Sequence, residues 1–134
     1  MILTPTYYVF KMYKVHQDAK LLSSHLVSED YVMDGKKIPS LSSSVSEDKN
    51  GNIHISVSNL NPDKEITLSV ELLGKTFEEV KTASVLTAPE YNSFNSFDKP
   101  EVVKPVEFKN YKKINGSGLE LTMPSKSVVV IEMK

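Results

Sequence analysis

Hydrophobic and polar residues change their spacing once along the chain, from a helical period near its start to a period of two further on. In residues 4–19, apolar side chains recur at helical spacing, and Thr4 and Pro5 are typical of a helix cap and a first turn. We therefore predict a helix there. Later in the chain apolar and polar residues alternate, as in Ile53–Asn59 and Ile66–Leu72, which predicts strands with one buried face.

The predicted helix carries more apolar surface than a single core needs. At about 100° per residue its apolar side chains cover an arc of roughly 220°, against about 100° for a helix that faces one core. They are Tyr8, Val9, Phe10, Met12, Tyr13 and Val15. We expect one side of the helix to cover the strand at 128–131, which is apolar on both faces, and the other side to contact a neighbour outside this chain. The interface candidates on the helix are Tyr8, Met12 and Val15.

Six further strands are predicted, each bounded by turn residues. They are His25–Met33, Leu41–Glu47, Thr82–Thr87, Val106–Lys109, Gly118–Met123 and Ser127–Met133. The pair Asn50-Gly51 tolerates positive φ and predicts a hairpin turn. Short strands with turn signals between them indicate an all-β fold, an antiparallel two-sheet β-sandwich preceded by one N-terminal α-helix.

The segment Ala88–Pro105 has no alternating pattern and holds three prolines. A loop of this length is functional or forms an interface. Its aromatic residues and asparagines allow two alternatives. They form a carbohydrate-binding surface, or the aromatics anchor the loop while the polar side chains bond its backbone. The second alternative concerns Phe94 and Phe97 as anchors, and Asn92, Asn95 and Asp98 as backbone partners. This second alternative is favoured because the chain lacks tryptophan, the aromatic residue best suited to stacking on a sugar. Asn92, Asn95 and Phe97 are the interface candidates in this loop.

Composition restricts the chemistry further. The net charge is −1, and all 16 basic residues are lysines, which argues against a nucleic acid partner. No cysteine is present, so there is no thiol nucleophile and no thiolate metal site, while the cellular compartment stays open. No apolar run is long enough to span a membrane, and we expect no membrane partner.

The acidic residues do not indicate a catalytic pair, because adjacent residues of a strand point to opposite faces. The acidic side chains considered are Glu29-Asp30, Glu47-Asp48 and Glu78-Glu79, together with Glu71 and Glu120. The three histidines lack the paired spacing of a metal site. His16 lies at the end of the helix, where a cation would favourably meet the helix dipole. We expect His54 to lie on a polar strand face with a surface or cross-strand role. The sequence thus predicts no catalytic residue, no metal and no cofactor.

Three segments resemble one enzyme family. Residues 4–19, Thr-Pro-Thr-Tyr-Tyr-Val-Phe-Lys-Met-Tyr-Lys-Val-His-Gln-Asp-Ala, resemble the last barrel helix of the α-L-arabinofuranosidases of glycoside hydrolase family 51. Residues 86–105 are similar to a loop in that family's C-terminal sandwich, and residues 121–130 to its closing hairpin. Tyr8 and Phe94 stand where the family more often has histidine.

The resemblance implies a non-catalytic accessory domain of a longer enzyme. Residues 1–20 would be the final helix of a missing α/β barrel, and residues 21–134 a jelly-roll-like C-terminal β-sandwich. The parent would release terminal α-L-arabinofuranosyl residues from arabinan, arabinoxylan or arabinose-containing oligosaccharides with retention, using two barrel glutamates, and would be a homo-oligomer. The family sandwich also takes a strand from the enzyme's N-terminus, so one sheet edge here should be open. The alternative is an autonomous carbohydrate-binding or adhesion module.

Overall fold

The computed structural model describes all 134 residues. It contains one α-helix, α1 (Pro5–Tyr13), a 3-10 turn, η1 (Lys14–His16), and eleven strands. The strands are β1 (Lys20–Leu21), β2 (Asp30–Met33), β3 (Lys36–Pro39), β4 (Leu41–Glu47), β5 (Ile53–Asn59), β6 (Ile66–Glu71), β7 (Val80–Leu86), β8 (Val106–Glu107), β9 (Tyr111–Lys113), β10 (Gly118–Met123) and β11 (Ser127–Met133). The predicted all-β fold with one N-terminal helix is confirmed.

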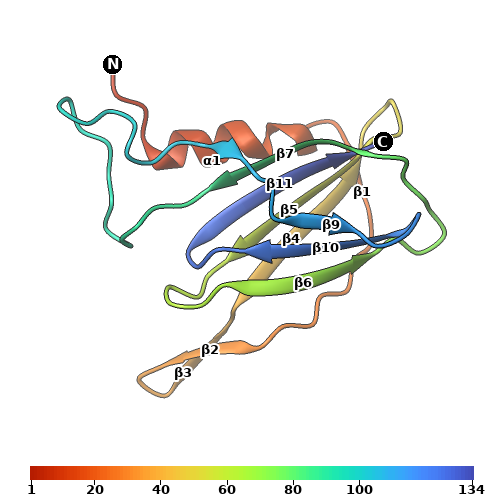
Figure 1. The fold of residues 1–134 in the computed structure, drawn as a ribbon, viewed down its shortest axis with the longest axis horizontal. Helices are drawn as coiled ribbons and strands as arrows, with labels where there is room; N and C mark the ends of the chain where they lie inside the picture. The colour runs from red at the N-terminus through yellow and green to blue at the C-terminus, as the bar shows by residue number, and fades with distance from the viewer.

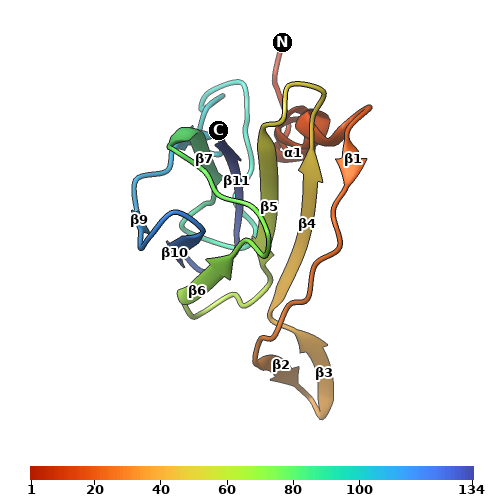
Figure 2. The ribbon, with the colours of Figure 1, turned by 90° about the vertical axis from the view of Figure 1, so that its right-hand side faces the viewer.

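Two antiparallel sheets form a sandwich (Figures 1 and 2). The larger sheet has the strand order β1-β4-β5-β11-β7-β8, and the smaller has the order β6-β10-β9. In the middle of the larger sheet, β5 and β11 pair Ile55 with Ile131 and Val57 with Val129. The smaller sheet has only three strands, and β6 lies at its edge.

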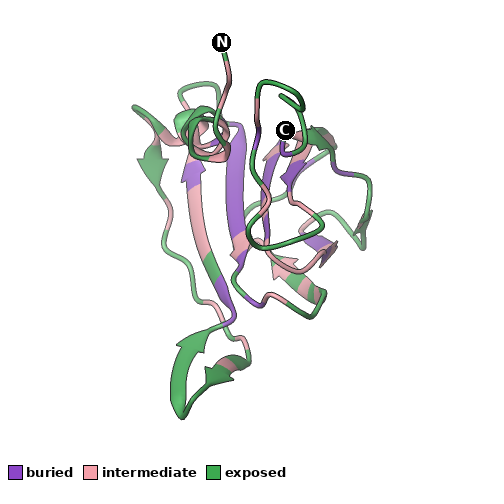
Figure 3. Cartoon of the chain, turned by 90° about the vertical axis from the view of Figure 1, so that its left-hand side faces the viewer, coloured by how far each residue is buried: buried purple, intermediate pink, exposed green.

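The core lies between the two sheets, and its side chains come from alternate positions of their strands. Figure 3 shows the buried segments of these strands. Leu119, Leu121 and Met123 from β10 are fully buried, and they share the core cluster with Val129 and Ile131 of β11. Each such side chain stabilises the fold by about 1.5–3 kcal/mol when removed from water. The period-two pattern of the sequence thus corresponds to one continuous core.

The helix covers the other face of the larger sheet. Met12 of α1 is buried against Leu86, Val103 and Val130, which form a second, smaller apolar cluster. Val128 packs against the same cluster. The prediction that the helix covers the strand at 128–131 is therefore confirmed.

Some element boundaries differ from those predicted. The α-helix ends at Tyr13 and continues only as the turn η1, so the prediction of a helix to residue 19 is too long. The predicted strand His25–Met33 is wrong over its first part, because only Asp30–Met33 pairs, in a hairpin with β3. β1, β3 and β9 were not predicted, since strands of two to four residues contain too few alternations to be recognised.

The hairpin β2–β3 projects from the body of the sandwich (Figure 2). Its turn contains Asp34 and Gly35, both with positive φ, and Gly35 is suited to that conformation. Val32, Met33 and Ile38 are exposed on this arm. The alternation of the sequence here does not correspond to a buried face.

Candidate functional site

The N-terminal helix is the first candidate surface. The Thr4 hydroxyl accepts a hydrogen bond from the backbone N–H of Tyr7 over 3.2 Å, which caps the helix as predicted. Met12 is buried between the helix and the larger sheet. We expected Met12 to be part of an exposed interface, and its burial excludes this. Phe10, on the outer side of the helix, is 75% exposed. The helix thus presents an aromatic side chain that this chain does not cover.

Tyr8 and Val15 are partly buried beside a hollow of about 400 Å³ between the helix and the end of the larger sheet. Its other lining residues are Lys11, Met12, Thr82, Ser84, Lys104, Pro105 and Val130. The Lys104 ammonium donates a hydrogen bond to the Glu101 carboxylate over 2.7 Å, which raises the lysine pKa. These two helix candidates therefore border an open surface, with a charged pair next to it.

The end of the helix is fixed to the larger sheet by His16. Its Nδ1 atom lies 2.6 Å from the Ser46 hydroxyl oxygen, and its Nε2 atom lies 2.9 Å from that of Ser56. Burial lowers the pKa of His16, and the nearby His54 lowers it further. Burial therefore opposes the cation that the helix dipole would favour at this position.

His54 belongs to the same polar layer beneath the helix end. Its side chain is buried, and its Nε2 atom lies 2.9 Å from the Asp48 carboxylate. The contact with His54 is the main reason that the pKa of Asp48 is well below its usual range, and Asn52 and the N–H of Asn50 add hydrogen bonds. The surface role considered for His54 is wrong, and the cross-strand role is closer, because Nδ1 faces Glu132 of the paired strand at 4.0 Å.

The loop 88–105 is the second candidate surface. The Asn95 amide is buried and donates hydrogen bonds to the carbonyl oxygens of Leu3 (2.7 Å) and Val103 (2.8 Å). Its oxygen accepts the N–H of Val103 over 2.7 Å. The expectation that Asn95 bonds the loop backbone is confirmed, and its use as an exposed interface candidate is excluded by its burial.

The aromatic residues of this loop are not anchors. Phe94 is 69% exposed, and Tyr91 and Phe97 are 84% exposed, so the expectation that Phe94 and Phe97 fix the loop to the protein is wrong. Asn92 and Asp98 are also exposed, and neither side chain bonds the loop backbone, so the expectation for these two residues is wrong. The sequence could not predict that these rings are exposed. A phenylalanine or tyrosine in a loop looks the same in the sequence whether its ring packs on its own domain or is exposed.

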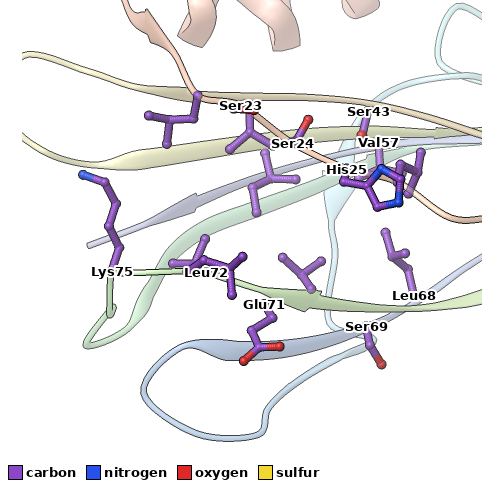
Figure 4. A pocket seen from close by; sticks show the side chains of 16 residues that line it. Ser23, Ser24, His25, Ser43, Val57, Leu68, Ser69, Glu71, Leu72 and Lys75 are labelled. Atoms are coloured by element: carbon purple, nitrogen blue, oxygen red, sulfur yellow. The ribbon is translucent and has the colours of Figure 1, made fainter.

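A third candidate is a groove of about 340 Å³ between the sheets, open beside β6 (Figure 4). Leu68, Val70 and Leu72 line it from one side, and the segment Leu22–Leu26 with Val45 lines it from the other. Figure 4 shows Ser69 and Glu71 pointing away from the groove, on the outer face of β6. An apolar groove next to an unpaired strand edge has the form of a site that accepts another strand.

Two of the acidic side chains are held in ion pairs. Glu47 is held by the Lys75 ammonium at 2.8 Å, and Glu132 lies 3.2 Å from that of Lys81. Glu71 is exposed on the outside of its strand. No group of three or more histidine, aspartate or glutamate side chains is placed to hold a metal ion. None of the helical segments has the length and apolar character needed to cross a membrane.

The chain is similar to known proteins of one family. A family model described as "Alpha-L-arabinofuranosidase C-terminal domain" matches residues 1–127. An intracellular exo-α-L-arabinofuranosidase of Bacteroides ovatus is 45% identical over 137 residues, which is 100% of this chain and 26% of the relative. The chain thus spans about a quarter of that relative.

Solved structures of two arabinofuranosidases contain a part with the same fold as this chain. The family 51 arabinofuranosidase of Xanthomonas axonopodis pv. citri is 32% identical with a TM-score of 0.94, over 100% of this chain and 27% of that protein. A family 51 α-L-arabinofuranosidase of Bifidobacterium longum matches with a TM-score of 0.87 at 18% identity, over 99% of this chain and 26% of the other. The matched part lies at the C-terminal end of the larger proteins.

Proposed function

Because the chain belongs to the family of α-L-arabinofuranosidase C-terminal domains, we propose that it is the non-catalytic accessory domain of a longer α-L-arabinofuranosidase. The reaction would be carried out by a catalytic α/β barrel in the same polypeptide. The substrates would be terminal α-L-arabinofuranosyl residues of arabinan, arabinoxylan or related oligosaccharides.

One observation carries this proposal. The whole chain matches a curated arabinofuranosidase at 45% identity, yet covers only 26% of it. The acidic side chains support the same assignment. Retaining hydrolysis requires two carboxyl groups about 5–5.5 Å apart on either side of the sugar. Here Glu47 and Glu132 are held in ion pairs, and Glu71 is exposed on an outer strand face.

A division at residue 20 forms part of the proposal. Residues 1–20 would complete the barrel with the outer side of α1, where Phe10 is exposed, and residues 21–134 would form the sandwich. Met12 and His16 would hold the two parts together, since both bind the larger sheet. A homo-oligomer of the parent is proposed from the family resemblance.

A strand from the missing part would add to the edge of β6. The backbone N–H of Leu72 donates to the carbonyl of Ser117 on the β10 side. Because bonding directions alternate in an antiparallel ladder, Leu68 and Val70 also bond β10, while Thr67, Ser69 and Glu71 direct their N–H and C=O groups outward. The groove beside β6 is lined by apolar side chains that such a strand would cover.

An autonomous carbohydrate-binding module is the second candidate. The exposed rings of Tyr91, Phe94 and Phe97 favour it, because sugars stack on aromatic faces. The exposed Phe10 on the helix argues against it, since a free module has no use for a second apolar face.

An activity assay tests the proposal. The purified chain alone should release no product from an aryl α-L-arabinofuranoside. A joined polypeptide, in which this chain replaces the matching C-terminal 26% of the Bacteroides ovatus relative, should hydrolyse that substrate. Activity of the chain alone that disappears on replacing Glu71, Glu78, Glu79 or Glu120 with glutamine would overturn the proposal.

A further inference from the structure

Three aromatic side chains of the long loop are exposed in a row. Tyr91, Phe94 and Phe97 follow one another at intervals of three residues, and each has more than two thirds of its surface exposed. A fully buried side chain of this size contributes about 1.5–3 kcal/mol relative to an exposed one. Three exposed rings within seven consecutive residues of one loop therefore indicate a segment that is covered in the working protein.

The backbone that carries these rings is held by hydrogen bonds. Asn95 makes three bonds of 2.7–2.8 Å, two through its amide N–H groups and one through its oxygen. On one side of it, the N–H of Ser93 bonds the carbonyl of Glu90. On the other side, the Ser96 hydroxyl accepts the N–H of Lys99. The exposed rings are therefore displayed by an ordered loop.

The loop lies beside the start of α1. The bond from Asn95 to the carbonyl of Leu3 joins segments 92 residues apart, and Figure 1 shows the loop near the N-terminus. In the relatives, the matched part is the C-terminal quarter, so the rest of their polypeptide enters the domain at the position of Met1. The aromatic loop thus borders the place where the catalytic part is attached.

We infer that Tyr91, Phe94 and Phe97 form a docking surface for the catalytic part of the same polypeptide, with Asn95 as a positioning residue. This inference rests on the proposed function. The bond between Asn95 and Leu3 couples the loop to the connection between the two parts. Docking would bury the three rings and would fix the angle at which the chain enters α1.

A protein surface fits this loop better than a sugar. Asn95, the buried asparagine between the rings, offers no free polar group to a sugar, because both its donors and its oxygen are already bonded within the chain. The free polar side chains beside the rings are those of Asn92 and Asp98, both exposed. No residue of Tyr91–Pro100 lines the hollow beside the helix or the groove beside β6. Aromatic residues are enriched in protein–protein contacts.

Photo-crosslinking in the joined polypeptide tests the inference. Benzoylphenylalanine replaces Phe97 in one sample and Ile114, which directly follows β9, in the control. Figure 1 shows the end of β9 on the side of the sandwich away from the loop. Ile114 is 53% exposed, so its probe is also accessible. The expected result is that the probe at 97 links to peptides of the catalytic part and the probe at 114 does not.

Three other results would overturn the inference. Links from position 97 to the same domain of a second copy would assign the loop to an oligomer contact. Protection of the probe by arabino-oligosaccharides would assign it to sugar binding. No link and no protection would leave the rings without a partner. The same sample is also assayed on the aryl arabinofuranoside. If it hydrolyses this substrate, the proposed function holds even where the docking surface does not.

Hydrogen exchange gives a second measurement that does not depend on the probe. The amides of residues 91–98 should exchange more slowly in the joined polypeptide than in the chain alone. A variant with Tyr91→Ser, Phe94→Ser and Phe97→Ser should lose this difference. A matched variant with Val32→Ser and Ile38→Ser, which changes exposed residues of the β2–β3 hairpin, should keep it. Equal exchange in both proteins would contradict the docking surface.

Discussion

The Nε2 atom of His16 lies 2.9 Å from the hydroxyl oxygen of Ser56, although 40 residues separate them. Ser56 is fully buried on the face of β5 that points away from the main core. Together with the contact from His16 to Ser46, this bond holds the end of the helical segment on the sheet. The helix is therefore part of the folded unit of this chain, and His16 is the side chain that joins the helix end to two strands of the sheet.

The first prediction concerns this histidine. Burial lowers the pKa of His16 below its usual value of 6.5, so the unfolded chain binds more protons than the folded chain when the pH falls below 6.5. The free energy of unfolding should therefore fall as the pH is lowered from about 7.5 towards about 5, and level off below the folded pKa. His16→Gln should flatten this dependence, which urea unfolding at several pH values measures.

His25 provides the matched control, because its side chain is exposed. His25→Gln should keep the pH dependence of the original chain. A slope that His16→Gln leaves unchanged would show that another group is responsible.

The second prediction concerns the underside of α1. Met12→Ala should lower the free energy of unfolding by about 2–4 kcal/mol, because it opens a cavity against Leu86, Val103 and Val130. Phe10→Ala in the same helix should change it by less than about 0.5 kcal/mol, since Phe10 is largely exposed. Denaturant unfolding of both variants makes the comparison, and equal losses would mean that the helix is not docked as described.

The third prediction concerns a buried asparagine that joins two turns. The Asn59 amide donates to the carbonyl oxygens of Lys64 (3.0 Å) and Pro124 (2.9 Å), and its oxygen accepts the N–H of Asn61. Asn59→Ala leaves these groups without partners and should cost about 2–4 kcal/mol. Thermal and urea unfolding measure the loss.

Asn92→Ala is the control for this change, because Asn92 is exposed in the long loop and has no hydrogen bond within the chain. It should leave the stability within about 0.5 kcal/mol of the original. A small effect at Asn59 would mean that water replaces its bonds.

The fourth prediction concerns the open edge of β6. In the chain alone, the amides of Thr67, Ser69 and Glu71 should exchange with solvent faster than those of Leu68 and Val70, which face β10. Hydrogen exchange of the individual amides, measured by NMR, detects this alternation of fast and slow positions. In the joined polypeptide the fast amides should become protected, whereas uniform protection of β6 in a monomer of this chain would refute the open edge.

Local patterns determined much of the fold. The alternation in Ile53–Asn59 and Gly118–Met123 places strands there because a half-buried strand needs one apolar face, whatever its neighbours are. Thr4 and Pro5 start the helix through short-range geometry, and the two apolar faces of residues 128–131 indicated a covering element. The same patterns, with the family resemblance, indicated a domain without catalytic residues.

Only the tertiary structure decided which polar residues are buried and which aromatic residues are not. His54 and Ser56 have the spacing of an exposed strand face, yet the helical segment covers them and satisfies Ser56 with His16. Phe94 and Phe97 are large apolar residues, which usually anchor a loop, yet they are exposed, while the polar Asn95 is buried. Burial depends on contacts between segments far apart in the chain, such as that from Asn95 to Leu3, and periodicity describes only neighbours along the sequence.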